Sequence, residues 1–144
     1  MPQTPKDSPA TLAPWQAVKV LRHIEAHLAE ALSVAELAAL VGLSTGYFSR
    51  AFRASHALSP HAFILQRRLA RAQTLMLASS RGLSEIALEC GFCDQPHLTK
   101  RFRGALGMSP AAWRRGQLQA RALPERGFPA RRQQGAGLAQ GLAV

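Results

Sequence analysis

Apolar residues recur at spacings of three and four along much of the chain, the pattern of helices with one buried face. Two such stripes are Val18–Leu21–Ile24–Leu28 and Leu65–Leu69–Ala72–Met76. Alternation with a period of two is absent and β-branched residues are few, so no strand is expected. The pattern predicts an all-α fold of about seven helices.

Local signals mark where these helices begin and end. Ser33 and Glu36 form a capping box, while Ser44 and Asp94 are typical N-cap residues. Gly42 is typical of a helix end, because glycine adopts the left-handed conformation at little cost. The first expected helix starts near Trp15. The six that follow are expected at about 33–41, 45–55, 59–78, 84–90, 95–106 and 109–114. The proline-containing lead 1–14 and the tail 116–144 are expected to be disordered.

A repeat of about fifty residues divides the chain. Residues 37–42 (LAALVG) and 48–53 (FSRAFR), followed by Ser59-Pro60, return as residues 86–91 (IALECG) and 98–103 (LTKRFR), followed by Ser109-Pro110. The offset is 49 up to the glycine and 50 after it, so the second copy has one extra residue near its turn. Each copy predicts a helix, a glycine turn and a second helix.

This arrangement is typical of a helix-turn-helix, in which the second helix enters the major groove of DNA. Ala38 and Ala87 are small enough to let the second helix of each copy cross closely, and apolar residues such as Phe52 and Phe102 hold it in place. The charge agrees with a polyanionic partner: the formal net charge is +10, and residues 15–115 hold 13 Lys/Arg against 6 Asp/Glu. Most of the excess therefore lies on the part expected to fold.

The side chains expected to face DNA lie on the open side of each second helix. Early residues are placed for base edges, and later basic residues for phosphates. The predicted DNA-binding residues are Ser44, Thr45, Tyr47, Ser49, Arg50 and Arg53 in the first copy, and Gln95, Pro96, His97, Thr99, Lys100 and Arg103 in the second.

The chain resembles the DNA-binding domain of the AraC/XylS family of bacterial transcription regulators over about residues 15–115. The resemblance is carried by residues 85–87 (EIA), 90–92 (CGF), 94–98 (DQPHL), 102–103 (FR), 107–110 (GMSP) and 113–114 (WR). It implies two helix-turn-helix subdomains, 15–57 and 83–115, joined by a long linker helix, 59–78. It also implies that both second helices read successive major grooves of promoter DNA, about 34–36 Å apart.

Two positions depart from the family pattern. Gly46 stands where a larger side chain is usual, so the first reading helix is expected to contact fewer bases and to be less stable. Ala57 replaces a usual glycine, and a left-handed conformation there would cost on the order of 1 kcal/mol.

The resemblance also implies partners. Double-stranded DNA is the expected ligand, and RNA polymerase is a candidate second partner. The chain has no room for the family's upstream effector-binding and dimerisation domain. It is therefore expected to act as a monomer, either as a stand-alone member or as the C-terminal part of a longer regulator.

Other functions are less well supported by the residues. Cys90 and Cys93 form a lone C-x-x-C that could serve a thiol- or metal-responsive sensor, but no second pair completes a zinc site. A protein-binding adapter is a further alternative. No arrangement suits catalysis, so no enzyme activity, cofactor or metal is expected. No bilayer-spanning run or signal peptide is found, which favours a cytoplasmic, nucleoid-associated location.

Overall fold

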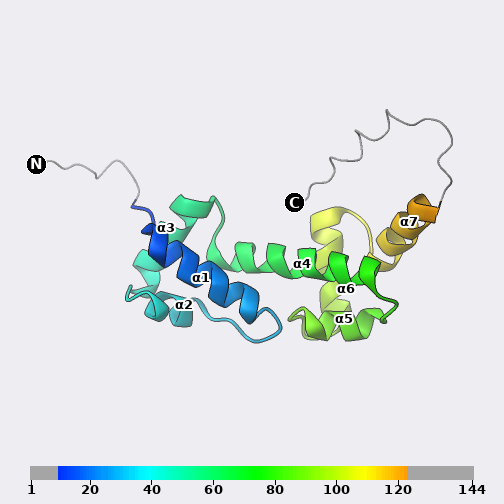
Figure 1. The fold of residues 1–144 in the computed structure, drawn as a ribbon, viewed down its shortest axis with the longest axis horizontal. Helices are drawn as coiled ribbons and strands as arrows, with labels where there is room; N and C mark the ends of the chain where they lie inside the picture. Colours follow the sequence, from blue (N-terminus) through cyan, green and yellow to red (C-terminus); the bar gives the residue numbers. More distant parts are fainter. Residues whose placement is uncertain (1–9, 123–144) are drawn as a thin grey trace, which may run out of the picture. The chain divides into compact units, whose positions relative to one another are not determined.

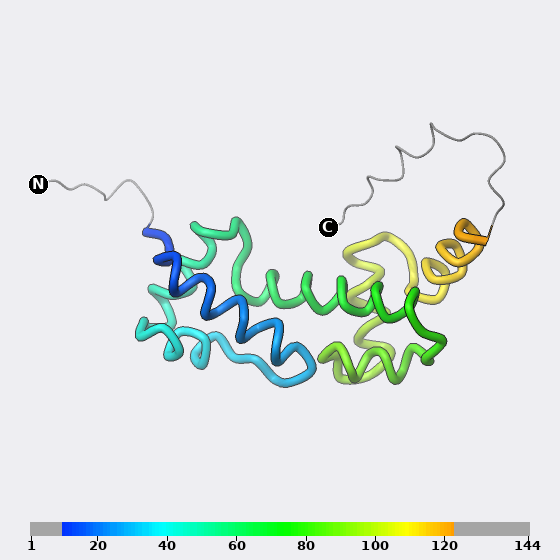
Figure 2. The backbone as a smooth tube through the Cα atoms, in the orientation of Figure 1, coloured from blue at the N-terminus to red at the C-terminus, as the bar shows by residue number. Residues whose placement is uncertain are grey.

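The computed structural model describes residues 10–122, which form seven helices and, within that range, no strand (Figure 1). In chain order the helices are α1 (Pro14–Ala26), α2 (Val34–Leu40), α3 (Thr45–His56), α4 (Pro60–Ala78), α5 (Leu83–Glu89), α6 (Gln95–Leu106) and α7 (Pro110–Ala122). The predicted all-α class is confirmed. Figure 2 traces the backbone through α4, which has 19 residues and follows α3 and precedes α5 along the chain.

Two compact units divide the chain. The first comprises the residues up to Arg68 together with Glu89–Gly91, and the second comprises Leu69–Leu88 and the residues from Phe92 on. The linker helix is thus not a separate part, since α4 contributes its first half to one unit and its second half to the other.

The core of the first unit is apolar and closely packed around α3. Phe48 and Phe52 are fully buried with ring centroids 5.6 Å apart, and Phe63 of α4 meets Phe52 edge-on at 5.4 Å. In α1 the buried residues are Val20 and Ile24, whereas Val18 is 48% exposed. The expected stripe is confirmed at Ile24 and Leu28, which are buried, and was wrong only at Val18, because the partner helices cover the face that includes Val20.

The second unit is built around α6 in the same way. Leu98 and Phe102 are fully buried, and Trp113 of α7 packs edge-on against Phe102 at 5.7 Å. In α4, Leu69, Ala72 and Met76 are buried as expected. The stripe continues in the first unit at Ile64 rather than Leu65, which is only partly buried.

Arg114 connects α7 to the end of α4 inside the second unit. Its guanidinium donates hydrogen bonds to the carbonyl oxygens of Met76 (3.0 Å), Ser79 (2.7 Å) and Arg81 (2.8 Å). These carbonyls lie at and just beyond the helix end, where no backbone N–H of the helix reaches them. A single side chain therefore holds the loop that leads into α5.

Both ends of the described region differ from expectation. Leu12 was assigned to a disordered lead, but its side chain is buried and its N–H donates to Ser55 Oγ at 2.9 Å. The last helix was expected to end by residue 115, but α7 continues to Ala122 with exposed side chains. Its Ala, Gln, Leu and Arg residues have good helix propensity, which sustains the extra turns without burial. The remaining parts of the expected lead and tail, 1–9 and 123–144, lie outside the described residues.

Candidate nucleic-acid interface

The turn before each second helix has the same geometry in both copies. Gly42 and Gly91 adopt φ values of 72° and 91°, which favour glycine. The residue after each glycine donates its N–H to the alanine carbonyl five positions earlier, Leu43 to Ala38 and Phe92 to Ala87, both at 2.9 Å. The repeat in the sequence therefore corresponds to a repeated turn.

In the second unit, α6 begins at a strong cap. Asp94 Oδ1 accepts the N–H of His97 at 2.9 Å, and Pro96 lies in the first turn, where its missing N–H costs nothing. With Leu98 and Phe102 buried, the opposite side of α6 faces solvent. Thr99 is partly exposed there, and Lys100 and Arg103 are exposed.

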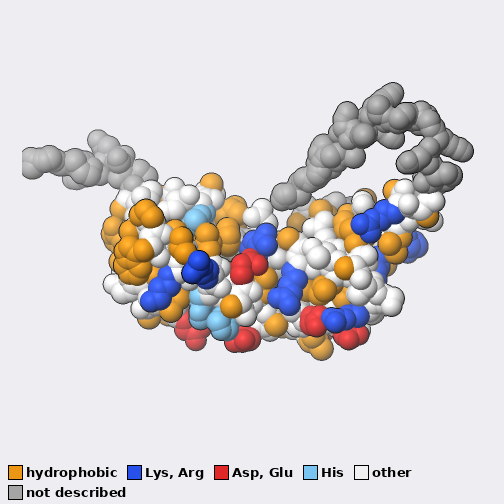
Figure 3. Space-filling model, in the orientation of Figure 1, with side chains coloured by type: hydrophobic (Ala, Val, Ile, Leu, Met, Phe, Trp, Pro, Cys, Tyr) orange, Lys and Arg blue, Asp and Glu red, His pale blue; other side chains and the backbone are white. Residues whose placement is uncertain are grey.

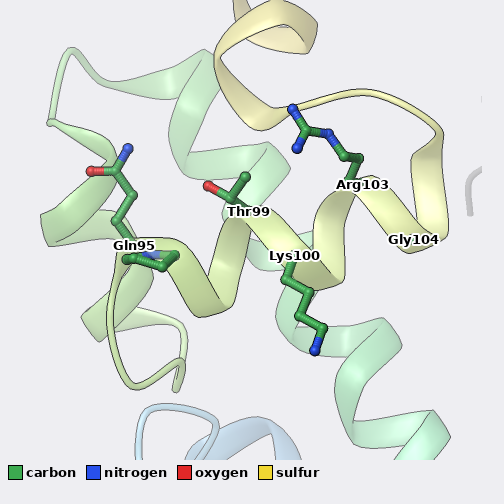
Figure 4. Close-up of a pocket in the computed structure, with 6 residues that line it drawn as sticks. Gln95, Thr99, Lys100, Arg103 and Gly104 are labelled. Carbon is green, nitrogen blue, oxygen red and sulfur yellow. The ribbon is translucent and has the colours of Figure 1, made fainter.

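The open side of α6 forms a shallow hollow. Its lining residues are Gln95, Pro96, Thr99, Lys100, Arg103 and Gly104. Figure 4 shows the side chains of Gln95, Thr99, Lys100 and Arg103 projecting from the helix. Five of the six residues predicted in this copy thus share one surface, and the sixth, His97, does not line it. Gly104 was missed, because its contribution is an absent side chain that no sequence pattern signals.

Gln95 is oriented by a neighbouring helix. Ser84 Oγ lies 3.3 Å from Gln95 Oε1, and its hydroxyl donates to that oxygen. Since the oxygen is engaged, the amide nitrogen with its two N–H groups is directed to other partners. This contact between the start of α5 and the start of α6 prepares Gln95 as a donor.

In the first unit, α3 presents a comparable set of side chains. Ser44 Oγ accepts the N–H of Tyr47 at 3.2 Å, so this hydroxyl serves as the N-cap. Among the remaining predicted residues, Ser49 is partly exposed, and the others are exposed: Thr45, Tyr47, Arg50 and Arg53. Gly46, in the first turn, leaves a gap in the side-chain row.

The basic side chains of the two second helices are available to an external partner. Arg50, Arg53, Lys100 and Arg103 make no hydrogen bond or ion pair within residues 10–122. Figure 3 shows Lys and Arg side chains at several places on one face of the molecule. Cations without internal partners are suited to phosphate groups.

Two of the three arginines of α4 have structural roles instead. Arg67 pairs with Glu25 at 2.6 Å, and Arg68 donates to the carbonyl oxygens of Leu28 (3.0 Å) and Glu30 (2.7 Å). These contacts hold α4 against α1 and the loop that follows it.

The two cysteines have different surroundings: Cys90 is buried and Cys93 is exposed. Within the described part of the chain, no group of three or more His, Cys, Asp and Glu residues could hold a metal ion. None of the helices described is long and apolar enough to cross a membrane.

The fold and the two exposed basic helices define a protein with a double helix-turn-helix. Comparison with known proteins agrees, because the helix-turn-helix domain family matches residues 37–116. The chain belongs to the AraC-type helix-turn-helix proteins.

Solved structures of this type resemble the chain closely. An AraC-type transcriptional regulator from Chromobacterium violaceum is 30% identical with a TM-score of 0.66, covering 76% of this chain and 95% of that one. The DNA-binding domain of the global transcriptional factor AdpA, solved in complex with a target DNA, is 34% identical with a TM-score of 0.68, covering 74% and 95%.

Curated relatives are longer proteins. The probable transcriptional regulator LumQ of Photobacterium leiognathi is 34% identical over 96 residues, which is 67% of this chain and 39% of LumQ. The regulator GbdR of Pseudomonas aeruginosa is 34% identical over 99 residues, or 27% of its own length. The match thus spans only about a third of these relatives.

Proposed function

We propose that this chain is the DNA-binding part of a sequence-specific transcription regulator, which inserts α3 and α6 into successive major grooves of promoter DNA. The observation that carries the proposal is the doubled exposed face: two capped helices, each held by buried aromatic or aliphatic residues and each presenting unpaired cations. The AdpA domain, solved on its target DNA, supports it.

The roles of the side chains follow from their places along each helix. Residues of the first turns, such as Thr45 and Gln95, lie where a helix end reaches base edges. With its oxygen engaged by Ser84, Gln95 presents N–H donors that suit acceptors such as N7 of a purine. Arg53 and Arg103 lie in the last turns and suit phosphates, which add affinity without sequence choice.

The operator then consists of two half-sites separated by one helical turn of DNA, about 34–36 Å. The two reading surfaces differ in every paired position from Thr45/Gln95 to Arg50/Lys100. The half-sites are therefore unlike, and the chain binds as a monomer to an asymmetric site. Such a regulator acts in the cytoplasm, and RNA polymerase is its proposed protein partner at the promoter.

Selection from a random DNA library with the purified chain tests this proposal. We expect enrichment of a bipartite site, with Gln95→Ala relaxing one base position by about 1–3 kcal/mol. Lys100→Ala should weaken all sites alike and reduce the salt slope by about 1. Equal affinity for every fragment at moderate salt would refute sequence-specific binding. A changed base preference for Lys100→Ala would refute the assignment of this residue to phosphate.

A further inference from the structure

The structure locates the extra residue of the second copy. Up to Leu43 and Phe92 the two turns match, since each donates its N–H to the carbonyl five residues before it. In the first copy the cap residue, Ser44, follows at once. In the second copy Cys93 intervenes before Asp94, so Cys93 is the insertion.

An inserted residue brings an additional backbone N–H, which needs an acceptor. The Cys93 N–H donates to Nδ1 of His97 at 3.1 Å. Tyr47 is the counterpart of His97 in α3. Both residues donate their backbone N–H to the side chain of the N-cap residue, Tyr47 to Ser44 and His97 to Asp94. The hydrogen bond to the ring therefore exists only in the second copy.

This hydrogen bond determines where the proton of the neutral imidazole lies. Because Nδ1 accepts, it carries no hydrogen, and the ring proton is on Nε2. The ring is also held by the buried Phe92, which it meets edge-on with centroids 5.4 Å apart. Two contacts thus fix both the orientation of His97 and its tautomer.

The outer nitrogen of His97 is open to a partner. His97 is partly exposed, and no hydrogen bond of its Nε2 occurs within residues 10–122. Among the described residues, His56 Nε2 is the one side-chain nitrogen or oxygen that is both buried and without a hydrogen-bond partner. Since His97 Nε2 also has no partner, it must be accessible to solvent. His97 Nε2 is therefore a solvent-accessible donor without a partner.

We propose that His97 binds DNA as an uncharged donor, with its Nε2–H directed to a phosphate oxygen beside the groove that α6 reads. This inference rests on the proposed function. A phosphate is favoured over a base because His97 does not line the hollow on the open side of α6. Hydrogen bonds to phosphate from neutral side chains and backbone N–H groups position a protein on its duplex. Unlike Lys100, a neutral donor displaces no condensed cation, so its contribution is independent of salt.

The tautomer is tested first, on the unaltered chain. Long-range ¹H–¹⁵N correlation spectra of the imidazoles at about pH 8, where histidine rings are in general neutral, should show His97 protonated on Nε2. The His97 signals are assigned by their loss in His97→Asn. Adding the selected operator should shift Nε2 and protect its proton from exchange. A proton on Nδ1, or an Nε2 signal unchanged by bound operator, would overturn the inference.

Binding measurements then test the role in affinity. In His97→Asn, Oδ1 takes the place of Nδ1 and can still accept from Cys93, but the outer donor is lost. We expect about a tenfold weaker affinity on preferred and unrelated sites alike, with an unchanged salt slope. The matched control is His61→Asn, since His61 is exposed on α4 and makes no hydrogen bond or ion pair with the predicted DNA-binding residues. The affinity of this variant should equal that of the wild type.

The outcomes separate the two proposals. If the wild-type chain selects an operator, two results for His97→Asn would overturn the uncharged phosphate contact. One is wild-type affinity, and the other is a salt slope reduced by about 1. A wild-type chain that selects no operator would refute the proposed function itself.

Discussion

Replacing Ala57 with glycine is expected to stabilise the first unit. Ala57 ends α3 with φ 66° and ψ 3°, and within residues 10–122 it is the one non-glycine residue with positive φ. Gly107 ends α6 in the same conformation, with φ 81°. In both caps the N–H donates to the carbonyl four residues earlier, Ala57 to Arg53 at 2.8 Å and Gly107 to Arg103 at 2.9 Å.

The magnitude follows from two opposing effects. A left-handed conformation costs an alanine roughly 1–2 kcal/mol because its Cβ crowds the following carbonyl. Glycine avoids this cost, but the greater freedom of its unfolded chain takes back about 0.4–1 kcal/mol. The Ala57 side chain is exposed, so its methyl group contributes no packing that would be lost. The net gain in the free energy of unfolding is about 0.5–1 kcal/mol.

Urea unfolding followed by far-ultraviolet circular dichroism measures this difference, and a thermal scan should show an increase in Tm of a few degrees. Ala39→Gly is the matched control, because Ala39 is exposed within α2 in ordinary helical conformation. There the same substitution should destabilise by about 1 kcal/mol. Equal signs for the two variants, or a loss of stability in Ala57→Gly, would refute the assignment of strain to the α3 cap.

Three further predictions concern the first unit. Gly46→Ala should raise the stability of this unit by about 1 kcal/mol in the same urea assay, since the new Cβ would meet only the flexible end of the Arg50 side chain, at 3.4 Å; a loss would show that the first turn of α3 needs glycine. Gly91→Ala should destabilise by at least about 2 kcal/mol more than Gly42→Ala, because its Cβ would meet the carbonyl oxygen of Leu28 whereas the site at Gly42 is open; similar losses would contradict this close approach. Burial lowers the pKa of His56 below its usual 6.5, so the folded chain binds fewer protons than the unfolded one. The contribution of His56 to stability is full above about pH 6.5 and is lost as the pH falls through the lowered pKa. His56→Phe should flatten this dependence in urea titrations from pH 7.5 to 5, and an unchanged pH dependence in this variant would refute the role of His56.

Much of the fold follows from local signals in the sequence. Ser33, Ser44 and Asp94 all accept the N–H three residues on, as their positions before apolar runs predicted. Gly42 and Gly91 have the positive φ expected of them. These features depend on a few neighbouring residues, and for this reason the sequence alone predicts them well.

The phase of each buried face was harder to predict. Val18 and Leu65 fit the helical period as well as Val20 and Ile64, but only the second pair is buried. A helix of this composition has apolar residues on adjacent faces, and the neighbouring helices determine which face they cover. The last turns of α7 have no buried face, so the sequence there shows no apolar periodicity from which the longer helix could have been predicted.

The candidate interface shows the same division. The repeat by itself determined that two helices carry exposed polar and basic residues, because a helix with one buried face must present the other to solvent. It also determined that one residue had been inserted near the second turn. Only the tertiary structure decided that this residue is Cys93, that its N–H is bound by His97, and that Ser84 orients Gln95. Each of these contacts depends on side-chain rotamers and on the approach of separate segments, which spacing along a sequence does not specify.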